Sequence, residues 1–308
     1  MKIIRFISSN LLLWVVLFAI IAYFYSPLFL VFRPTINWFF ASAMFGIGLV
    51  MKNDDYRNIA KTPLSVLFGT ICQFTIMPGL SYVIGRMMNL PDEILLGLVI
   101  TGAAPGAMTS NVISYLSKAD VAYSVSLTTV ATLLAPILTP LLTLLLVGQR
   151  IPVSFIKMSL TIIYTVVLPL LSGFAVRSFF PKFVSKVEDL PPLISVMSIV
   201  VITSFVVAAN VNSINKATFI IVLAVIVVNI LGMSLGYFAG YIPRFDLKKR
   251  KTLAIEIGMQ NAGLGVVLAL KLFSEDVAVP AAFFTIWCII SASLFARLMM
   301  SFEKKKIK

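Results

Sequence analysis

Long apolar segments recur along the whole chain, and they limit its fold more than any other feature does. The runs are roughly 16 to 25 residues long, close to the ~20 residues that an α-helix needs to cross ~30 Å of hydrocarbon. Hydrophobic residues make up 60% of the 308 residues, and charged residues make up 12%. Too little polar surface exists to cover a soluble globule. The sequence therefore predicts an all-α integral membrane protein.

Hydropathy places about ten transmembrane helices, numbered here in chain order as spans 1 to 10. They cover residues 10–31, 35–51, 63–88, 93–117, 121–147, 153–178, 190–209, 217–242, 252–270 and 277–300. A division near residue 150 gives two units of five spans each, 1–150 and 151–308. Because five is odd, the units have opposite orientations in the membrane. The sequence thus predicts two inverted five-helix repeats, an arrangement common in secondary transporters.

Basic residues are distributed unevenly between the predicted loops. If the N-terminus is cytoplasmic, 19 of the 25 basic residues fall on the cytoplasmic side. The other side holds Arg33, Arg86, Arg150, Lys157, Lys216 and Lys271. Since Lys and Arg concentrate in cytoplasmic loops, we expect both termini to be cytoplasmic. The net charge of +13 does not indicate nucleic-acid binding, because the basic clusters at 244–251 and 304–308 adjoin spans and are expected to meet anionic lipid headgroups.

Glu256 is the one acidic residue placed inside an apolar stretch, among the glycines and amides of residues 254–263. A charged side chain at mid-bilayer costs at least ~2.5 to 3.5 kcal/mol, so it persists where a cation, a water-filled cavity or a proton relay compensates it. This favours an ion-coupled carrier. The chain has no His, and proton relays usually use further carboxylates or His, so sodium fits better than a proton. The same lack of partners argues against an enzyme.

The fourth span of each predicted half contains residues that break helices. Pro105 and Gly106 lie within 101–111, and three glycines lie within 256–265. Proline and clustered glycine loosen the hydrogen-bond ladder, and unwound backbone is tolerated in a membrane only where it is buried or lines a cavity. The freed carbonyls suit a cation, while the N–H groups of the following half-helix suit an anion. The sequence therefore predicts a cation and anion site at two broken helices.

Neutral polar side chains accompany these breaks. Ser110 and Asn111 follow the first break, and further Ser and Thr residues lie in the next span. Their oxygens suit a hard monovalent cation, although single hydroxyls in membranes often only join helices. Gln73 in span 3 fits a ligand role and a structural role equally, and Asn229 is expected to be structural. Cys72 and Cys288 are expected to be small buried side chains.

The two motifs together resemble the bile acid:sodium symporter family. The first is Pro105-Gly106 followed by Thr109-Ser110-Asn111, and the second is Glu256-Ile257-Gly258-Met259-Gln260-Asn261 with Gly263-Leu264. The resemblance extends over nearly the whole chain. It implies a ten-helix fold with a panel domain of spans 1, 2, 6 and 7 and a core domain of spans 3–5 and 8–10. Broken spans 4 and 9 would cross at their breaks.

The resemblance also implies the ligands. It implies two sodium ions, the first bound by the side chains of Ser110, Asn111, Ser124, Thr128 and Glu256. The second would be bound by Glu256, Gln260 and Gln73 with the backbone carbonyls of Ile257 and Met259. The organic anion would lie between panel and core, near Ala107, Met108, Thr109 and Asn261.

The expected function is sodium-coupled import of an organic anion by alternating access in the bacterial inner membrane. Bile-acid-binding members tend to carry Trp-His-Asn in the last span, where this chain has Trp287-Cys288-Ile289, and a Gly-Thr pair near Ala107-Met108-Thr109. These departures favour a smaller carboxylate, such as a pantoate-like acid or a keto acid, over a bile acid. A proton-coupled or efflux-type carrier on the same fold, and a receptor or scaffold that does not transport, stay as alternatives. The sequence does not determine the stoichiometry or the oligomeric state.

Overall fold

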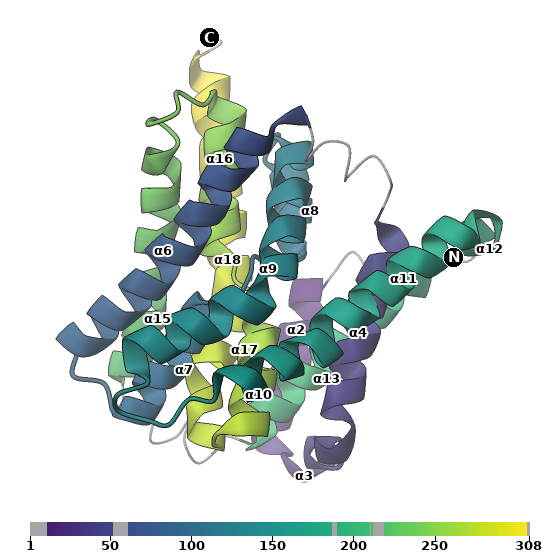
Figure 1. Ribbon diagram of the computed structural model, residues 1–308, viewed down its shortest axis with the longest axis vertical. Helices are drawn as coiled ribbons and strands as arrows, with labels where there is room; N and C mark the ends of the chain where they lie inside the picture. Colours follow the sequence, from purple (N-terminus) through teal and green to yellow (C-terminus); the bar gives the residue numbers. More distant parts are fainter. Residues whose placement is uncertain (1–10, 52–60, 187–189, 210, 212–218, 307–308) are drawn as a thin grey trace.

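A computed structural model describes residues 11–51, 61–186, 190–209, 211 and 219–306. Both chain ends and the basic residues Lys2, Arg5, Lys52, Arg57 and Lys216, which the orientation prediction used, lie outside these ranges. The described residues form helices and contain no β-strand. Their one isolated β-bridge joins Gly106 to Gln260. The predicted all-helical class is therefore confirmed (Figure 1).

The helices of the N-terminal half follow the predicted spans closely, with one exception. They are α2 (Leu11–Phe24), α3 (Pro27–Leu30), the 3-10 turn η1 (Arg33–Thr35), α4 (Ile36–Val50), α6 (Pro63–Met87), α7 (Asp92–Gly102), α8 (Thr109–Leu116) and α9 (Val121–Val147). The single span predicted for 10–31 is wrong, because α2 ends at Phe24 and a separate short helix follows. Pro27 and Pro34 lack the N–H that would continue the hydrogen-bond ladder.

The helices of the C-terminal half also follow the predicted spans closely. Its helices are α10 (Phe155–Ile162), the π-helical turn η2 (Ile163–Val167), α11 (Leu168–Phe179), α12 (Pro181–Lys186), α13 (Leu190–Ala209), α15 (Phe219–Ala239), α16 (Leu247–Gly258), α17 (Ala262–Leu272) and α18 (Glu275–Lys306). The wide turn η2 directly precedes Leu168-Pro169. Because proline cannot donate a ladder hydrogen bond, a π-turn at this place is a common accommodation.

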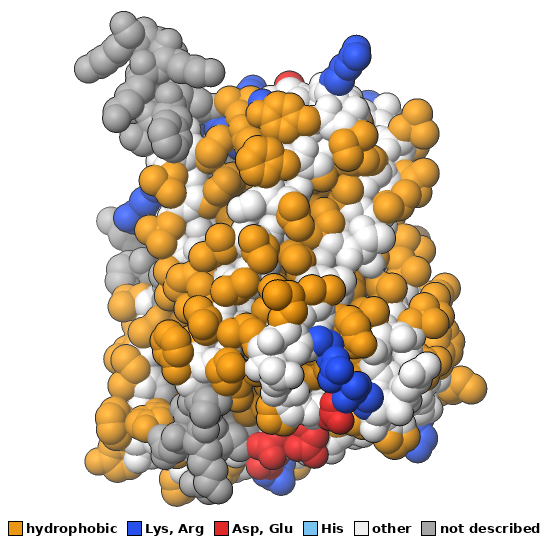
Figure 2. Space-filling view, turned by 90° about the vertical axis from the view of Figure 1, so that its left-hand side faces the viewer, with side chains coloured by type: hydrophobic (Ala, Val, Ile, Leu, Met, Phe, Trp, Pro, Cys, Tyr) orange, Lys and Arg blue, Asp and Glu red, His pale blue; other side chains and the backbone are white. Residues whose placement is uncertain are grey.

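Six helical segments of the described chain are long and apolar enough to cross a membrane. They are Pro27–Val50, Pro63–Met87, Val121–Val147, Phe155–Phe179, Phe219–Ala239 and Glu275–Met300, and shorter apolar helices accompany them at Leu13–Phe24, Leu193–Ala209 and Ala262–Leu272. Hydrophobic side chains cover most of the face shown in Figure 2. The protein is thus a multi-pass membrane protein.

Two sets of helix contacts organise the molecule. In one, α4 packs against α11 and α13, and α13 packs against α2. A Cβ on Gly48 of α4 would lie 2.1 Å from the Leu170 carbonyl oxygen of α11. A Cβ on Gly173 of α11 would lie 2.2 Å from the Phe45 carbonyl oxygen of α4. Glycine therefore lets α4 and α11 approach closely. In the other, α16 packs against α6, α8, α9 and α15. The second set includes the half-helices α8 and α16, one from each broken helix, whereas α17 packs against α7, α18, α10, α4 and α13.

Candidate functional site

The two helix breaks lie against each other. The first separates α7 from α8 at residues 103–108, and the second separates α16 from α17 at 259–261. The Ala107 N–H donates to the Met259 carbonyl at 2.7 Å, and the Asn261 N–H donates to the Pro105 carbonyl at 2.8 Å. Each break therefore provides hydrogen-bond partners for backbone groups that have none in the interrupted helix of the other break. The second break is shorter than the predicted 256–265, because Glu256 still lies in the last turn of α16.

Side chains from neighbouring helices bind further carbonyls at the breaks. Thr139 of α9 donates its hydroxyl to the Ala103 carbonyl at 2.7 Å, and Asn229 of α15 donates to the Gly258 carbonyl at 2.7 Å. Both side chains are fully buried. The contact of Asn229 agrees with its expected structural role. Sequence reasoning missed Thr139, since nothing in the sequence separates it from the other threonines of α9.

Glu256 is the centre of the site, and only 2% of its surface is exposed. One carboxylate oxygen, Oε1, accepts hydrogen bonds from the hydroxyls of Ser110 and Ser124. The other, Oε2, accepts a hydrogen bond from the Thr128 hydroxyl at 2.9 Å. Three hydroxyls from α8 and α9 thus converge on one carboxylate from α16.

Asn111 completes this network. Its side-chain oxygen lies 2.8 Å from the Ser124 hydroxyl oxygen and 3.5 Å from the Thr128 hydroxyl oxygen, as an alternative acceptor for these groups. The structure therefore brings together all five side chains predicted for the first sodium ion. One carboxylate among neutral oxygens is a donor set that suits a hard monovalent cation and does not require a transition metal. The described residues contain no cluster of three or more His, Cys, Asp or Glu side chains.

Gly106 has a steric role that the sequence did not reveal. A Cβ at this position would lie 2.6 Å from Oε2 of Glu256, which is closer than real Cβ contacts allow. The sequence indicates Gly106 only as a helix breaker. The structure shows that glycine also admits the carboxylate next to the backbone of the other break.

The residues predicted for the second sodium ion form a separate network. Gln73 donates to the side-chain oxygen of Gln260 at 2.7 Å, and the Gln260 amide donates to the Ile257 carbonyl at 2.8 Å. The Met259 carbonyl accepts the Ala107 N–H across the breaks. Within the described part of the chain, no hydrogen bond joins Glu256 to Gln73 or Gln260.

The residues predicted to contact the anion are more accessible than those predicted to bind sodium. Ala107, Met108, Thr109 and Asn261 are half-buried, whereas Glu256 is buried. The Asn261 side-chain oxygen caps α17 by accepting the Leu264 N–H at 3.2 Å. Its amide nitrogen is the part suited to an anion, while the Ala107 N–H is already bound to Met259. The Met108 sulfur lies 3.9 Å from the Asn111 amide nitrogen.

Lys251 corrects one expectation. The cluster at 244–251 was expected to meet lipid headgroups, but Lys251 is completely buried. Its ammonium group donates to the Ser117 carbonyl at 3.3 Å, at the C-terminal end of α8. The carbonyls and the negative dipole end of a helix C-terminus favour a cation there. The prediction for the cysteines is confirmed, because Cys72 and Cys288 are both free and buried.

Comparison with known proteins decides the family. The model of the Sodium Bile acid symporter family matches residues 38–217, which is more than half of the chain. The chain belongs to this family. It is 37% identical to the "Uncharacterized sodium-dependent transporter YocS" of Bacillus subtilis (strain 168), over 99% of this chain and 95% of that protein.

Plant members of the sodium bile acid symporter family are similar as well. The chain is 30% identical to the "Probable sodium/metabolite cotransporter BASS1, chloroplastic" of Arabidopsis thaliana, over 89% of this chain and 69% of that protein. It is also 30% identical to the corresponding BASS2 protein of Oryza sativa subsp. japonica, over 96% and 71%. These relatives are named as transporters, in agreement with the prediction that the chain is not an enzyme. The resemblance drawn from the two sequence motifs is confirmed.

Proposed function

We propose that this protein is a sodium-coupled symporter that imports a small organic anion. The observation that carries the proposal is the buried Glu256 carboxylate with its three hydroxyl donors. A buried charge needs an opposite charge or a polar cavity. The hydroxyls of Ser110, Ser124 and Thr128 are neutral, so a bound monovalent cation would supply the compensating charge.

Two sodium ions fit the oxygens around the breaks. The first would bind Glu256 with Ser110, Asn111, Ser124 and Thr128. The second would bind Gln73, Gln260 and the carbonyls of Ile257 and Met259, with Glu256 shared. The oxygens of Gln260 and Ile257 already accept amide N–H groups, so an ion at the second position would rearrange those hydrogen bonds.

The organic anion would bind beside the sodium ions. Asn261 and the backbone near Met108 and Thr109 are the contacts we propose, because they are half-buried and lie next to the N-terminal ends of α8 and α17, where the helix dipole favours negative charge. Few polar groups are available from Ala107 or Cys288-Ile289. A small carboxylate such as pantoate or a keto acid therefore fits better than a bile acid. The names of the plant relatives refer to sodium and a metabolite, without naming the metabolite.

Transport would follow from the movement of two bodies. The panel would comprise α2, α4, the helix formed by α10, η2 and α11, and α13, and the core would comprise α6 to α9 and α15 to α18. Sodium would bind first, order the two breaks and thereby complete the anion site. Rocking of panel against core would then give alternating access, and the sodium gradient would supply the free energy through the coupled affinities. The ten spans would form two inverted halves, 1–150 and 151–308, in the bacterial inner membrane.

The decisive experiment measures the midpoint of thermal unfolding in sodium and in equal potassium. The purified protein should show a higher midpoint in sodium, because a ligand that binds only the folded form stabilises it by about 2.7 kcal/mol at a hundred times its Kd. Glu256→Gln should remove this rise. Asp92→Asn, which changes an exposed carboxylate, should keep it. If sodium and potassium act alike while the midpoint follows pH only when Glu256 is present, the protein is proton-coupled.

Uptake into proteoliposomes tests the substrate. Pantoate and small keto acids should accumulate when sodium is higher outside than inside, and Glu256→Gln should stop accumulation. Strong saturable uptake of a bile acid, with no uptake of or competition by small acids, would contradict the proposed substrate class. Binding without flux would identify a receptor instead.

A further inference from the structure

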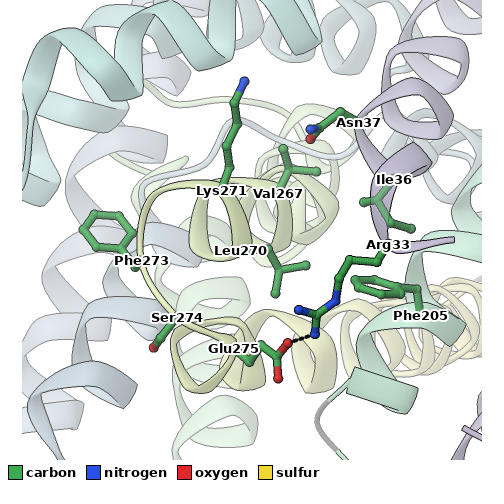
Figure 3. Close-up of a pocket in the computed structure, with 10 residues that line it drawn as sticks. All are labelled: Arg33, Ile36, Asn37, Phe205, Val267, Leu270, Lys271, Phe273, Ser274 and Glu275. Atoms are coloured by element: carbon green, nitrogen blue, oxygen red, sulfur yellow. Dashed lines mark hydrogen bonds and ion pairs between the residues drawn. The ribbon is translucent and has the colours of Figure 1, made fainter. Parts of the chain in front are cut away.

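A pocket of about 340 Å³ lies apart from the sodium network (Figure 3). It is found at the end of the molecule opposite the C-terminus, where α4 begins and where α17 turns into α18 (Figure 1). Arg33 and Asn37 line it from one side. Lys271 and Glu275 line it from the other side. The pocket therefore lies between helices that we assign to the panel and helices that we assign to the core.

The charges of the lining favour an anion. Arg33 and Lys271 are basic and Glu275 is the one acidic lining residue; Asp276 follows in the chain but is outside the lining. Arg33 donates to a carboxylate oxygen of Glu275 (Figure 3). Their side chains are 62% and 41% exposed, and an ion pair this exposed contributes little to stability. A carboxylate ligand can therefore replace Glu275 at the guanidinium without a large loss of stability.

The position of these two basic residues is unusual for the chain. Arg33 and Lys271 are two of the six basic residues on the predicted non-cytoplasmic side, where basic residues are disfavoured. Lys271 lies in the last turn of α17, where a cation also suits the helix dipole. Arg33 lies in the three-residue turn η1, where no long helix provides a dipole that favours a cation. An anion bound in the pocket would explain why both basic residues lie on this side.

The pocket and the proposed anion site lie at opposite ends of α17. Gly263, Val267 and Lys271 are four residues apart and so share one face of this helix. At its start, a Cβ on Gly263 would lie 3.0 Å from the Phe40 ring of α4. Ten residues of helix separate Lys271 from Asn261, or ~15 Å. The same pair of helices, α4 and α17, therefore borders the pocket and the breaks.

We propose that this pocket is an outer anion site, which holds the carboxylate of the organic anion through Arg33, Lys271 and Asn37 before the anion reaches Asn261. This proposal rests on the proposed function for its substrate. The volume is at the lower end of the range for ligand pockets, which suits a small carboxylate. A guanidinium group such as that of Arg33 commonly binds a carboxylate with parallel N–H groups. The phosphate of an anionic lipid has similar chemistry, and the experiment separates the two.

A reporter cysteine tests the site without transport. Leu270→Cys, in a protein that also carries Cys72→Ala and Cys288→Ala, places one thiol in the pocket lining; Phe273→Cys is a second reporter if the first variant does not fold. The rates of reaction with a sulfonate-bearing and a trimethylammonium-bearing methanethiosulfonate reagent are compared. Each rate is divided by the rate of the same reagent with a free thiol in solution. This relative rate should be higher for the sulfonate reagent than for the trimethylammonium reagent. Equal relative rates would overturn the proposal.

The sign of the variants separates an anion site from a structural ion pair. Arg33→Gln and Lys271→Gln should each lower the sulfonate preference about twofold or more, the size expected for a unit charge roughly 8 Å away through water. Glu275→Gln should raise it by a similar factor. If Arg33 and Glu275 only form a structural ion pair, Arg33→Gln and Glu275→Gln should change the sulfonate preference in the same direction. That result would contradict the proposal. Arg150→Gln and Asp92→Asn, which remove a different exposed ion pair, should change nothing.

Protection identifies the ligand. Millimolar pantoate or pyruvate should slow the sulfonate reagent in the reporter protein, and the effect should be lost in Arg33→Gln. If phosphatidylglycerol vesicles protect while neither acid does, the pocket is a lipid site and the proposal is wrong. The assay requires no sodium gradient and no transport. A failure here with an intact sodium effect of Glu256 leaves the proposed symport standing.

Discussion

At the scale of single residues, burial separates two kinds of polar group around the breaks. Ser110, Ser124 and Thr128 are fully buried, and all three donate to Glu256. Met108, Thr109 and Asn261 are half-buried. Buried oxygens favour a dehydrated cation, whereas half-buried groups remain accessible to a larger ligand. This difference agrees with the proposed division between sodium and organic anion.

Ser110→Ala should weaken the sodium effect on the unfolding midpoint, with sodium affinity lower by about tenfold. The reason is that a hydrogen bond to a charged group contributes about 1.5–3 kcal/mol, and the hydroxyl is also a proposed ligand. The matched control is Ser114→Ala, one turn further along α8. Ser114 is equally buried and its hydroxyl has no hydrogen-bond partner. Equal loss of the sodium effect in both variants would show that Ser110 has no ligand role.

At the scale of helices, α8 is attached to α16 near both of its ends. Ser110 in its first turn donates to Glu256, and the carbonyl of Ser117 just beyond its last residue accepts the Lys251 ammonium. In the turn that follows, Thr252 exchanges hydrogen bonds with the backbone of Asp120 at 2.9 and 3.0 Å. A change in the position of α16 is therefore transmitted to the residues of α8 that we propose as sodium ligands.

The support of the first break gives a prediction at the same scale. Thr139→Val should lower the unfolding midpoint, because the Ala103 carbonyl loses its donor from α9 and an unsatisfied buried acceptor costs about 1–3 kcal/mol. Thr143→Val is the control. Thr143 is also fully buried, but it donates to the carbonyl of Thr139 within its own helix, where a ladder N–H is also available. Equal midpoints for the two variants would show that the break does not depend on Thr139.

At the scale of the whole molecule, the distribution of basic residues predicts the orientation in the membrane. Gln149 precedes Arg150 on the predicted outer side, and Lys248 lies on the predicted cytoplasmic side; both are exposed. In a protein without native cysteines, Gln149→Cys should react with a membrane-impermeant thiol reagent on intact cells. Lys248→Cys should react only after permeabilisation, because the positive-inside rule keeps its loop in the cytoplasm. The reverse labelling pattern would show that the protein has the opposite orientation in the membrane, and the proposed import direction would then be wrong.

The sequence by itself determined the class of the protein, the places where two helices break and the position of Glu256 within an apolar stretch. Each of these follows from local chemistry: the length of apolar runs, proline and glycine within them, and a carboxylate where the membrane makes charge costly. The motifs also identified the family correctly. The end of the first predicted span failed, since the effect of Pro27 on a helix depends on how the next segment packs.

Only the tertiary structure decided which groups meet. Ser110 and Glu256 are 146 positions apart, and no spacing rule joins them. The burial of Lys251, the donation from Thr139 to the first break and the closeness of Gly106 to Glu256 depend equally on how helices from the two halves pack. The pairing of Arg33 with Glu275 beside Lys271 depends on the same packing. Sequence periodicity defines the face of a helix, but the partner of that face is fixed by the lowest free energy of the assembled helices.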